Sequence, residues 1–291
     1  MIPSYHFIFR KRFTVFLSSS HPVTHGAWSY GPNVIEVGGL NIQEAKPLPA
    51  DLKQFMDSAT NGVILVSFGS ALTPSQMKKE QLDIFIGMFA TLKQYSFIWK
   101  CDIDIENLPE NVKILNWLPQ QDLIAHPNLK VFVTHGGIGS LTEAIYHKAA
   151  LVGIPFAQDQ RPNLLRAEKH GYAVLLEYDT LTTAALTSAV QKAMESSQMA
   201  AALDRVHKLY TDREMKPAEK ASWWIEYVCR NGMEAGQMLK PIFSDIPWYQ
   251  THHLDTLLVL VSVLGLMIGL MVGLCKCCRS CCCKTKKQKE E

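Results

Sequence analysis

Short runs of branched apolar residues, separated mostly by helix-length amphipathic stretches, constrain the fold of this chain more than any other feature. The runs are Val63–Phe68, Phe97–Lys100, Val112–Leu115, Val131–Thr134, Leu151–Ile154 and Ala173–Glu177, and the clearest helical stretches are Ser75–Gln94 and Leu181–Ser196. This alternation predicts an α/β fold whose parallel sheet carries helices on both faces. Ligands of such sheets bind at the carboxyl ends of the strands, so the residues that follow each run are the candidates for a site.

The segment before the first run has the composition of a linker. "EAKPLPADLKQ" (44–54) contains two prolines that break regular structure, followed by Asp51 and Gln54 at the spacing of a helix-start capping box. We therefore expect a linker at residues 44–50 and an α/β domain that begins at residue 51.

One stretch near the end is apolar enough to cross a membrane. "LLVLVSVLGLMIGLMVGL" (257–274) contains no charged residue, and at about 1.5 Å per residue it approaches the roughly 30 Å thickness of a hydrocarbon core. A buried core helix is the alternative, but the stretch is apolar on every face and a basic segment follows it at once. We expect a single transmembrane helix at residues 256–275, preceded by a juxtamembrane segment at 241–255.

The charge of the chain, +2 overall, is concentrated in the tail, 276–291. The tail is rich in lysine, and the bias of Lys and Arg toward the cytoplasm places it in the cytosol and the globular part in a lumen. This basic charge is therefore no indication of nucleic-acid binding. Six of the eight cysteines also crowd this boundary, which favours S-palmitoylation over a zinc site; only Cys101 and Cys229 are left for the globular part.

The start of the chain does not fit a luminal domain. Arg10, Lys11 and Arg12 precede only five clearly apolar positions, which is too short for the apolar centre of a secretory signal. The simplest resolution is that the chain lacks its original N-terminal part.

Two glycine turns follow predicted strands. "FGS" (68–70) follows the first run, and "HGGIGS" (135–140) follows the fourth and leads into a helix expected at Leu141. Glycine lets the backbone approach a ligand closely, and the N–H groups at a helix start favour phosphate. The alternative is that the glycines serve turn geometry alone.

The neighbouring residues separate three kinds of nucleotide site. The chain has no G-x-x-x-x-G-K-[ST], which excludes a P-loop. Gly137, Gly139 and Asp159 imitate the spacing of a dinucleotide fingerprint, but Thr142 occupies its third glycine position. His135 is not part of that fingerprint, although an imidazole there could donate a hydrogen bond to a phosphate oxygen.

The stretch from Trp117 to Gln160 resembles the signature segment of the UDP-glycosyltransferases, in particular their animal, UDP-glucuronosyltransferase-like branch. "THGG", "EAIYH", "VGIP" and the closing "DQ" carry the resemblance, which extends from about Pro32 to the basic tail. The family implies a GT-B glycosyltransferase, an enzyme with two facing Rossmann-like domains. Residues 51–240 would be the C-terminal, UDP-sugar-binding domain, and residues 1–43 would be the remnant of an N-terminal acceptor domain.

The resemblance also implies which residues bind the substrate. Trp117 would stack on uracil and Gln120 would contact the base or ribose, whereas Glu143 would accept hydrogen bonds from the ribose hydroxyls. His135 and the N–H groups near the glycines would hold the diphosphate, while Asp159 and Gln160 would bind the sugar. The full substrate-binding set is Gly69, Ser70, Trp117, Leu118, Gln120, His135, Gly137, Gly139, Ser140, Glu143, Asp159 and Gln160.

Two of these assignments have structural alternatives, and two positions depart from the family pattern. Ser140 and Glu143 also have the spacing of a helix capping box, and Asp159 could simply start a helix. Gly139 stands where many relatives have asparagine. Lys148, Ala149 and Ala150 stand where the common pattern has a glycine and a proline, which is expected to loosen the sheet edge without touching the ligand.

The expected activity is transfer of a sugar from a UDP-sugar to a small lipophilic acceptor, with inversion at the anomeric carbon. In this family the catalytic histidine and its aspartate lie in the acceptor domain, so no catalytic residue is assigned here, and His21 and His25 are not promoted to that role. The alternative function is a catalytically silent, membrane-anchored subunit that binds UDP-sugar or pairs with related transferases.

The remaining expectations concern cofactors, partners and cellular location. No cofactor or metal is expected, because the UDP-sugar is a substrate, and homo- or hetero-oligomers with related transferases are possible partners. Lys287 and Lys289 have the spacing of a dilysine retrieval signal, which favours the endoplasmic reticulum membrane, although a simple basic stop after the membrane helix would look similar.

Overall fold

The computed structural model describes residues 14–240 and 246–287. The chain forms two compact units, the first made of residues 15–30 and 34–231, and the second of the described parts of 1–14, 31–33 and 232–291. The first unit holds every residue assigned to the candidate site.

The centre of the first unit is a parallel sheet of six strands, and each expected run contributes one strand. The strands are β3 (Val63–Ser67), β4 (Ser96–Lys100), β5 (Val112–Leu115), β6 (Leu129–Thr134), β7 (Ala150–Gly153) and β8 (Ala173–Leu175). Their order is β5-β4-β3-β6-β7-β8, and every neighbouring pair is parallel. The direction of winding therefore reverses between β3 and β6, which is where a doubly wound sheet opens a crevice for a ligand.

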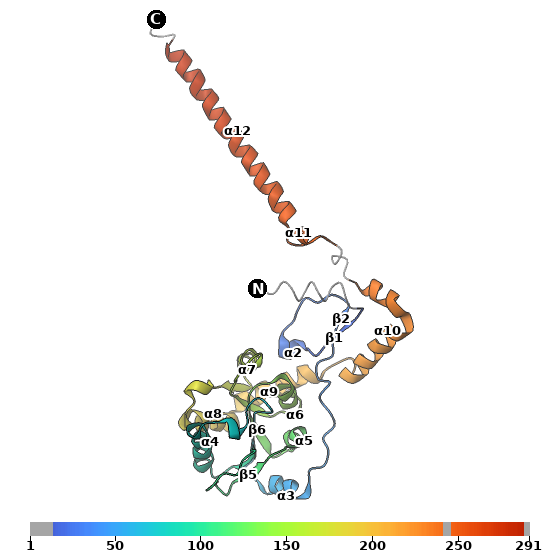
Figure 1. The fold of residues 1–291 in the computed structure, drawn as a ribbon, viewed down its shortest axis with the longest axis vertical. Coiled ribbons are helices and arrows are strands. Elements are labelled where there is room, and N and C mark those ends of the chain that lie inside the picture. Colours follow the sequence, from blue (N-terminus) through green and yellow to red (C-terminus); the bar gives the residue numbers. More distant parts are fainter. Residues whose placement is uncertain (1–13, 241–245, 288–291) are drawn as a thin grey trace. The chain divides into compact units, whose positions relative to one another are not determined.

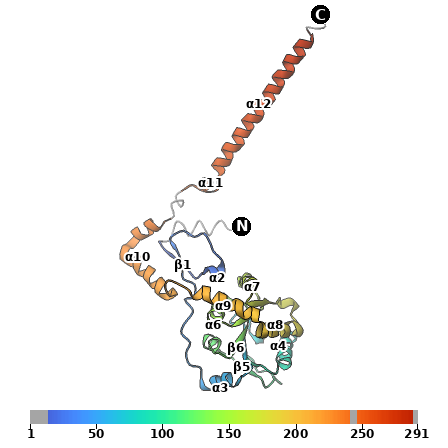
Figure 2. The ribbon, with the colours of Figure 1, turned by 180° about the vertical axis from the view of Figure 1, so that it is seen from behind.

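Helices cover both faces of this sheet, as the alternating sequence predicts (Figure 1). One face packs against α3 (Ala50–Ser58), α5 (Gln120–Ile124), α6 (Ile138–His147), α7 (Gln160–Lys169) and α9 (Ser197–Thr211). The other face packs against α4 (Lys79–Thr91) and α8 (Thr183–Glu195), which lie together in both views (Figure 2). Val63 and Leu65 point to the first face whereas Ile64 and Val66 point to the second, because successive side chains of a strand alternate.

Helix starts differ more from the sequence expectations than strands do. The stretch expected as one helix over 75–94 begins with a 3₁₀ turn, Pro74–Gln76, before α4 begins at Lys79, and another 3₁₀ turn, Tyr178–Thr180, precedes α8. The capping box expected at Asp51 is wrong, because α3 already begins at Ala50, and its N-cap, Pro49, makes no side-chain cap. Asp51 lies instead in the first turn, where Lys113 contacts its carboxylate at 3.0 Å and holds its pKa below the usual value.

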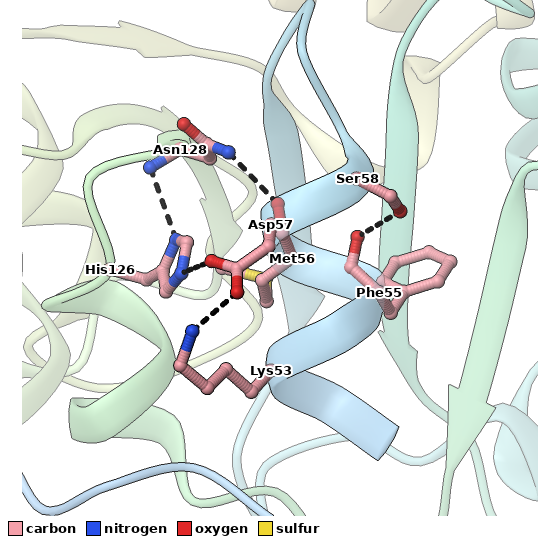
Figure 3. A network of polar contacts seen from close by, with 7 residues as sticks. All are labelled: Lys53, Phe55, Met56, Asp57, Ser58, His126 and Asn128. Atoms are coloured by element: carbon pink, nitrogen blue, oxygen red, sulfur yellow. Dashed lines mark hydrogen bonds and ion pairs between the residues drawn. The ribbon is translucent and has the colours of Figure 1, made fainter. Parts of the chain in front are cut away.

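A polar network at the edge of the sheet where the strands begin connects α3 to the turn before β6 (Figure 3). Asp57 accepts a hydrogen bond from Nε2 of His126 at 3.1 Å and also pairs with Lys53. His126 Nδ1 accepts from the backbone N–H of Asn128, whose side-chain amide donates to the carbonyl of Met56 at 2.9 Å. These bonds join chain segments about 70 residues apart and explain these polar residues by structure alone.

Residues 15–30 and 34–43, before the linker, belong to the first compact unit. They form a small parallel sheet of β1 (Phe16–Ser18) and β2 (Val34–Glu36), joined through the short helix α2 (Pro22–His25). Ile35 and Val37 pack there against Ala221 and Trp224 of α10 (Pro217–Leu239), a helix that is kinked at Gly232.

The second unit contains the part of α10 that follows the kink, the short helix α11 (Trp248–Thr251) and the long helix α12 (Leu254–Lys287). Residues Leu254–Lys276 of α12 are long and apolar enough to cross a membrane, by length and composition. The helix begins two residues before the expected span, and its backbone continues into the basic tail. Lys289 of the expected retrieval signal, the side chains of the tail cysteines beyond Cys275, and Arg10 to Arg12 lie outside the described residues.

Candidate functional site

The candidate site lies at the carboxyl edge of the sheet, around the point where the winding reverses. Gly69 and Ser70 follow β3, and His135 to Gly137 follow β6, so the two expected glycine turns end the two central, directly paired strands. Trp117 follows β5, and Asp159 and Gln160 follow β7. Parallel strands present their carboxyl ends at one edge, so the structure brings these residues to a common edge.

The His135 imidazole lies between the two glycine turns. A Cβ added at Gly137 would lie 2.6 Å from His135 Nε2, and one added at Gly69 would lie 3.2 Å from His135 Cε1. Gly69 also has a φ of +60°, a conformation that favours glycine. The two glycines are therefore required by the close approach of the backbone to this ring.

Burial lowers the pKa of His135, although the Asp159 carboxylate opposes this effect. The ring is consequently neutral at pH 7 and presents one donor and one acceptor nitrogen. Its buried Nδ1 has no hydrogen-bond partner within residues 14–240 and 246–287, and neither has the buried Oγ1 of the preceding Thr134. A polar ligand at the carboxyl edge of the sheet could provide hydrogen-bond partners for these two atoms.

The start of α6 adds donors beside this histidine. The helix begins at Ile138, three residues before the expected start at Leu141, and Gly137 is its N-cap without a side-chain hydrogen bond. The N–H groups of Ile138, Gly139 and Ser140 therefore lie in the first turn, where an α-helix provides no internal partner. No acidic residue occupies this turn, which leaves the positive end of the helix available to an anion.

A lysine that the sequence reasoning missed lies next to the first glycine turn. Lys100, the last residue of β4, donates from Nζ to the carbonyl of Gly69 at 2.8 Å. Its ammonium therefore brings a positive charge to the turn that holds Gly69 and Ser70 of the expected substrate-binding set. The sequence signal that could have identified Lys100 as a site residue is its position at the carboxyl end of a predicted strand.

The exposed indole of Trp117 is the most unusual side chain of this edge. It is 74% exposed, whereas the next residue, Leu118, is 6% exposed and packs in the core. Burying Leu118 fixes the backbone from which the indole projects. A large, uncovered aromatic face held in this way suits stacking on a planar ligand.

Gln120 joins the Trp117 loop to α6. Its Nε2 donates to Glu143 Oε2 at 2.7 Å and to Ser140 Oγ at 3.2 Å. Burial raises the pKa of Glu143, and the hydrogen bond from Gln120 opposes that rise. The capping-box alternative for Ser140 and Glu143 is wrong, because α6 begins before Ser140 and both residues lie inside the helix.

The two residues expected at the sugar have different environments. Asp159 is exposed and is the N-cap of α7, but its side chain makes no cap bond and accepts instead from Asn163 at 2.8 Å. Asn163 also donates to the carbonyl of Gly136, which places Asp159 next to the glycine loop. Gln160 is 8% exposed, and its Oε1 accepts from the backbone N–H groups of Phe156 and Ala157, so its amide nitrogen is the group left to donate to a ligand.

Residues 39–46, which we call the strap, cross over α5 and α6 and were also missed. Asn41 donates to the carbonyl of Gly139 at 3.3 Å and to Thr142 Oγ1 at 3.2 Å. The backbone N–H groups of Gln43 and Lys46 donate to Gln121 and Asp122 of α5. The strap therefore holds the two helices that carry Gln120, Ser140 and Glu143.

The two histidines not promoted to catalysis have structural partners. His21 Nδ1 accepts from the N–H of Val23, its ring lies edge-on to Tyr210, and burial lowers its pKa to about 4. His25 Nδ1 pairs with Thr24 Oγ1 at 2.8 Å. Neither residue needs a catalytic role to explain its position.

An exposed indole, a half-buried amide–carboxylate pair, a neutral imidazole and a helix N-terminus line one edge of the sheet. These groups suit an anionic ligand with an aromatic part. Among residues 14–240 and 246–287, no three His, Cys, Asp or Glu side chains converge as a metal site would require.

Comparisons with known proteins identify the family of the chain. The family model described as "UDP-glucoronosyl and UDP-glucosyl transferase" matches residues 23–290. UDP-glucosyltransferase 2 of Dactylopius coccus is 34% identical over 245 residues, covering 84% of this chain and 47% of the relative. UDP-glucuronosyltransferase 2B33 of Macaca mulatta is 34% identical over 252 residues, covering 86% of this chain and 46% of the relative. The chain thus spans about half the length of the curated relatives it matches.

Solved glycosyltransferases share the fold. The calicheamicin glycosyltransferase CalG4 matches with a TM-score of 0.60 at 20% identity, over 80% of this chain and 56% of its own. A glycotransferase of kitacinnamycin matches with a TM-score of 0.52 at 25% identity, over 64% of this chain and 45% of its own. The expected fold class, a Rossmann-like GT-B domain followed by one apolar helix, is confirmed.

Proposed function

Because the chain belongs to the UDP-glucoronosyl and UDP-glucosyl transferase family, we propose that it supplies the donor-binding half of a membrane-anchored UDP-glycosyltransferase. The complete enzyme would transfer a sugar from a UDP-sugar to a small lipophilic acceptor with inversion. The site residues would bind the donor, and the acceptor and the catalytic base would be held by the N-terminal domain of the complete protein.

One observation carries the proposal: the exposed indole of Trp117 lies three residues before Gln120, the first residue of α5, whose amide is hydrogen-bonded to Glu143. Uracil would stack on the indole, and the free carbonyl of Gln120 would accept from a donor on the base or ribose. Glu143 would also accept from the ribose hydroxyls, because a carboxylate accepts up to about four hydrogen bonds and here receives them from Gln120 and Asn41. A nucleoside fits Trp117, Gln120 and Glu143 better than a simple anion does, because a simple anion has no planar ring to stack on the indole.

The diphosphate would lie over the winding reversal. The first-turn N–H groups of α6, one nitrogen of His135 and the backbone around Gly69 offer neutral donors, and Lys100 adds positive charge. Asp159 and the amide nitrogen of Gln160 would then contact the sugar. Trp117 follows β5, the glycine turns follow β3 and β6, and Asp159 follows β7, so base, diphosphate and sugar would lie in the order of these strands.

The proposal includes a cellular location and possible protein partners. α12 would anchor the protein in the endoplasmic reticulum membrane as a single-pass helix, with the globular unit in the lumen and the basic tail in the cytosol. A homo- or hetero-oligomer with related transferases is compatible with this arrangement.

Calorimetry with UDP and with NAD tests the binding proposal. The 291-residue chain in lipid nanodiscs is expected to bind UDP and to prefer it to NAD. Trp117→Ala should weaken UDP binding about tenfold, because aromatic stacking on a base contributes on the order of 1–3 kcal/mol. Trp223→Ala is the matched control: this α10 tryptophan is 44% exposed and already stacks on Tyr227 at 5.3 Å.

A preference for NAD, or the same loss of affinity in both tryptophan variants, would reject the assignment of Trp117 to the base. The purified chain is also expected to bind UDP without forming glycoside, since general-base catalysis typically contributes about 10² to 10⁴ in rate. Glycoside formation that His135→Ala abolishes would show that the catalytic residues lie in this half.

A further inference from the structure

A pocket of about 560 Å³ is lined in part by the strap and shares no residue with the candidate donor site. Its walls come from the strap, from α6 and α9, and from residues 213–218 at the start of α10. Volumes of this size accommodate small organic ligands. The pocket lies wholly within the first compact unit.

Apolar side chains form most of the pocket walls although they face solvent. Leu40 of the strap is 44% exposed, Tyr146 of α6 is 40% exposed and Met215 is 41% exposed. Ile42 and Pro217 also line the pocket. Three large, half-covered side chains around one cavity provide a surface for an aromatic or aliphatic body.

Arg213 is the polar group that makes this pocket specific. Its Nη1 donates to the carbonyl of Gly38 and its Nε donates to the carbonyl of Tyr210 at 2.7 Å. The guanidinium also lies over the Tyr210 ring, 4.3 Å from the centroid, which fixes its orientation. Its remaining nitrogen, Nη2, is buried and has no hydrogen-bond partner in the described part of the chain. A fixed cation in the pocket wall, with a donor that the described residues leave unpaired, favours an anionic ligand.

The groups around Arg213 favour an anionic acceptor. Lys216 lines the same pocket and adds a second positive charge, against one carboxylate, that of Glu44. Burial raises the pKa of Tyr210, and its hydroxyl interacts with the side chains of Arg213 and Thr142. His207 donates from Nδ1 to the carbonyl of Ile145 at 3.1 Å, and the bond fixes its ring in the wall.

We propose that this pocket binds a small carboxylate with an aromatic or aliphatic body. The carboxylate would accept hydrogen bonds from Arg213 Nη2 and from Lys216, and the body would pack against Leu40, Tyr146 and Met215. A charge-assisted pair with a guanidinium is stronger than a neutral hydrogen bond, so the negative charge of the ligand should dominate selectivity.

The location of the pocket gives this binding a route to the donor site. The strap residues Leu40 and Ile42 line the pocket, while Asn41 between them bonds to Gly139 and Thr142 of α6. A ligand that orders the strap would therefore act on the helix that starts at the expected diphosphate position.

The test is calorimetry on the full chain in lipid nanodiscs, with heats from empty nanodiscs subtracted. The probes are 1-naphthoate and the neutral 1-naphthalenemethanol, which share one aromatic body. Ala218→Trp places an indole in the pocket from an exposed helical position, and Ala200→Trp on the exposed side of α9 is the matched control, since Ala200 does not line the pocket. A UDP titration of each variant reports separately on the donor site.

We expect 1-naphthoate to bind at least about tenfold more tightly than the alcohol. Ala218→Trp should weaken 1-naphthoate at least tenfold and leave UDP binding unchanged, whereas Ala200→Trp should change neither. Lys216→Gln, which removes an exposed charge, should reduce the preference for the acid. No binding of 1-naphthoate, equal affinity for acid and alcohol, or equal effects of the two tryptophan variants would overturn the proposal. Failure of UDP to bind any variant would count against the proposed function alone.

Discussion

Lys148 ends α6 in a backbone conformation that is costly for any residue with a side chain. Its φ is 62° and its ψ is 43°, which is the left-handed C-cap position where the family pattern has glycine. The side chain reaches Asp204 of α9, with Nζ and Oδ1 2.8 Å apart, but both groups are largely exposed. The departure noted in the sequence therefore falls on a position where glycine is favoured.

Replacing Lys148 by glycine should stabilise the protein. The left-handed conformation costs a residue with a Cβ roughly 1–2 kcal/mol, and glycine avoids this cost. Glycine also gives the unfolded chain more conformational entropy, which reduces the gain in stability by roughly 0.5–1 kcal/mol. The net gain is about 0.5–1 kcal/mol, which corresponds to a rise in Tm of roughly 1–4 °C for a domain of this size. The lost ion pair should subtract little, because exposed pairs contribute little to stability.

Thermal unfolding of the nanodisc-embedded chain, followed by circular dichroism, measures this gain. Lys148→Gly is compared with wild type and, to separate the ion pair, the same substitution is made in an Asp204→Asn background. Lys148→Ala is the control, because alanine has the same backbone strain and should not raise the Tm. A Tm unchanged or lowered by Lys148→Gly in both backgrounds would refute the argument from backbone strain.

Four further outcomes follow from the structure. Gly153→Ala should destabilise the fold by about 1–3 kcal/mol in urea unfolding, because the new Cβ would lie 2.1 Å from the buried side chain of Leu164. Adding Leu164→Val to this variant should recover part of the lost stability. Gln120→Ala should raise the pKa of Glu143, seen by NMR titration of the carboxyl, because a hydrogen bond that favours the charged form is lost; no change would exclude that bond. Partial burial lowers the pKa of His135, so its contribution to stability is present above the unfolded pKa of 6.5 and is lost as pH falls; the urea midpoint should therefore be lower at pH 5.5 than at 7.5. On sealed microsomes, an epitope on the globular unit of the complete protein should be protected from protease and one on the tail digested, and the reverse pattern would overturn the proposed orientation.

The strands could be predicted from the sequence because each is a dense run of branched apolar residues. The runs beginning at Val63 and Val112 coincide with strands almost to the residue. β3 is buried throughout, as a run covered on both faces should be, whereas β5 lies at the sheet edge and is half-buried. The last run was expected to reach Glu177 but pairs only to Leu175, because the register with β7 ends at Gly153.

Helix starts were less predictable, because they depend on backbone geometry more than on side-chain caps. α3 begins after Pro49 and α6 after Gly137, and neither start has the side-chain hydrogen bond that a capping pattern presumes. Trp117 and His135 could be selected from the sequence because of their motif, whereas Asn41 could not. Its contact with Gly139 spans 98 residues, and no local pattern encodes that distance.

The central claim is that one edge of the sheet holds the base and the diphosphate of UDP through different residues. Calorimetric titration of uridine and of UDP into wild type, Trp117→Ala and His135→Ala tests it directly. Trp117→Ala should weaken both ligands by the same factor, about tenfold, because both contain the base. His135→Ala should weaken UDP and leave uridine unchanged, because the imidazole lies against the glycine turns and the start of α6. Equal losses of uridine and UDP affinity in His135→Ala, or a Trp117→Ala chain that binds uridine as wild type does, would contradict the account.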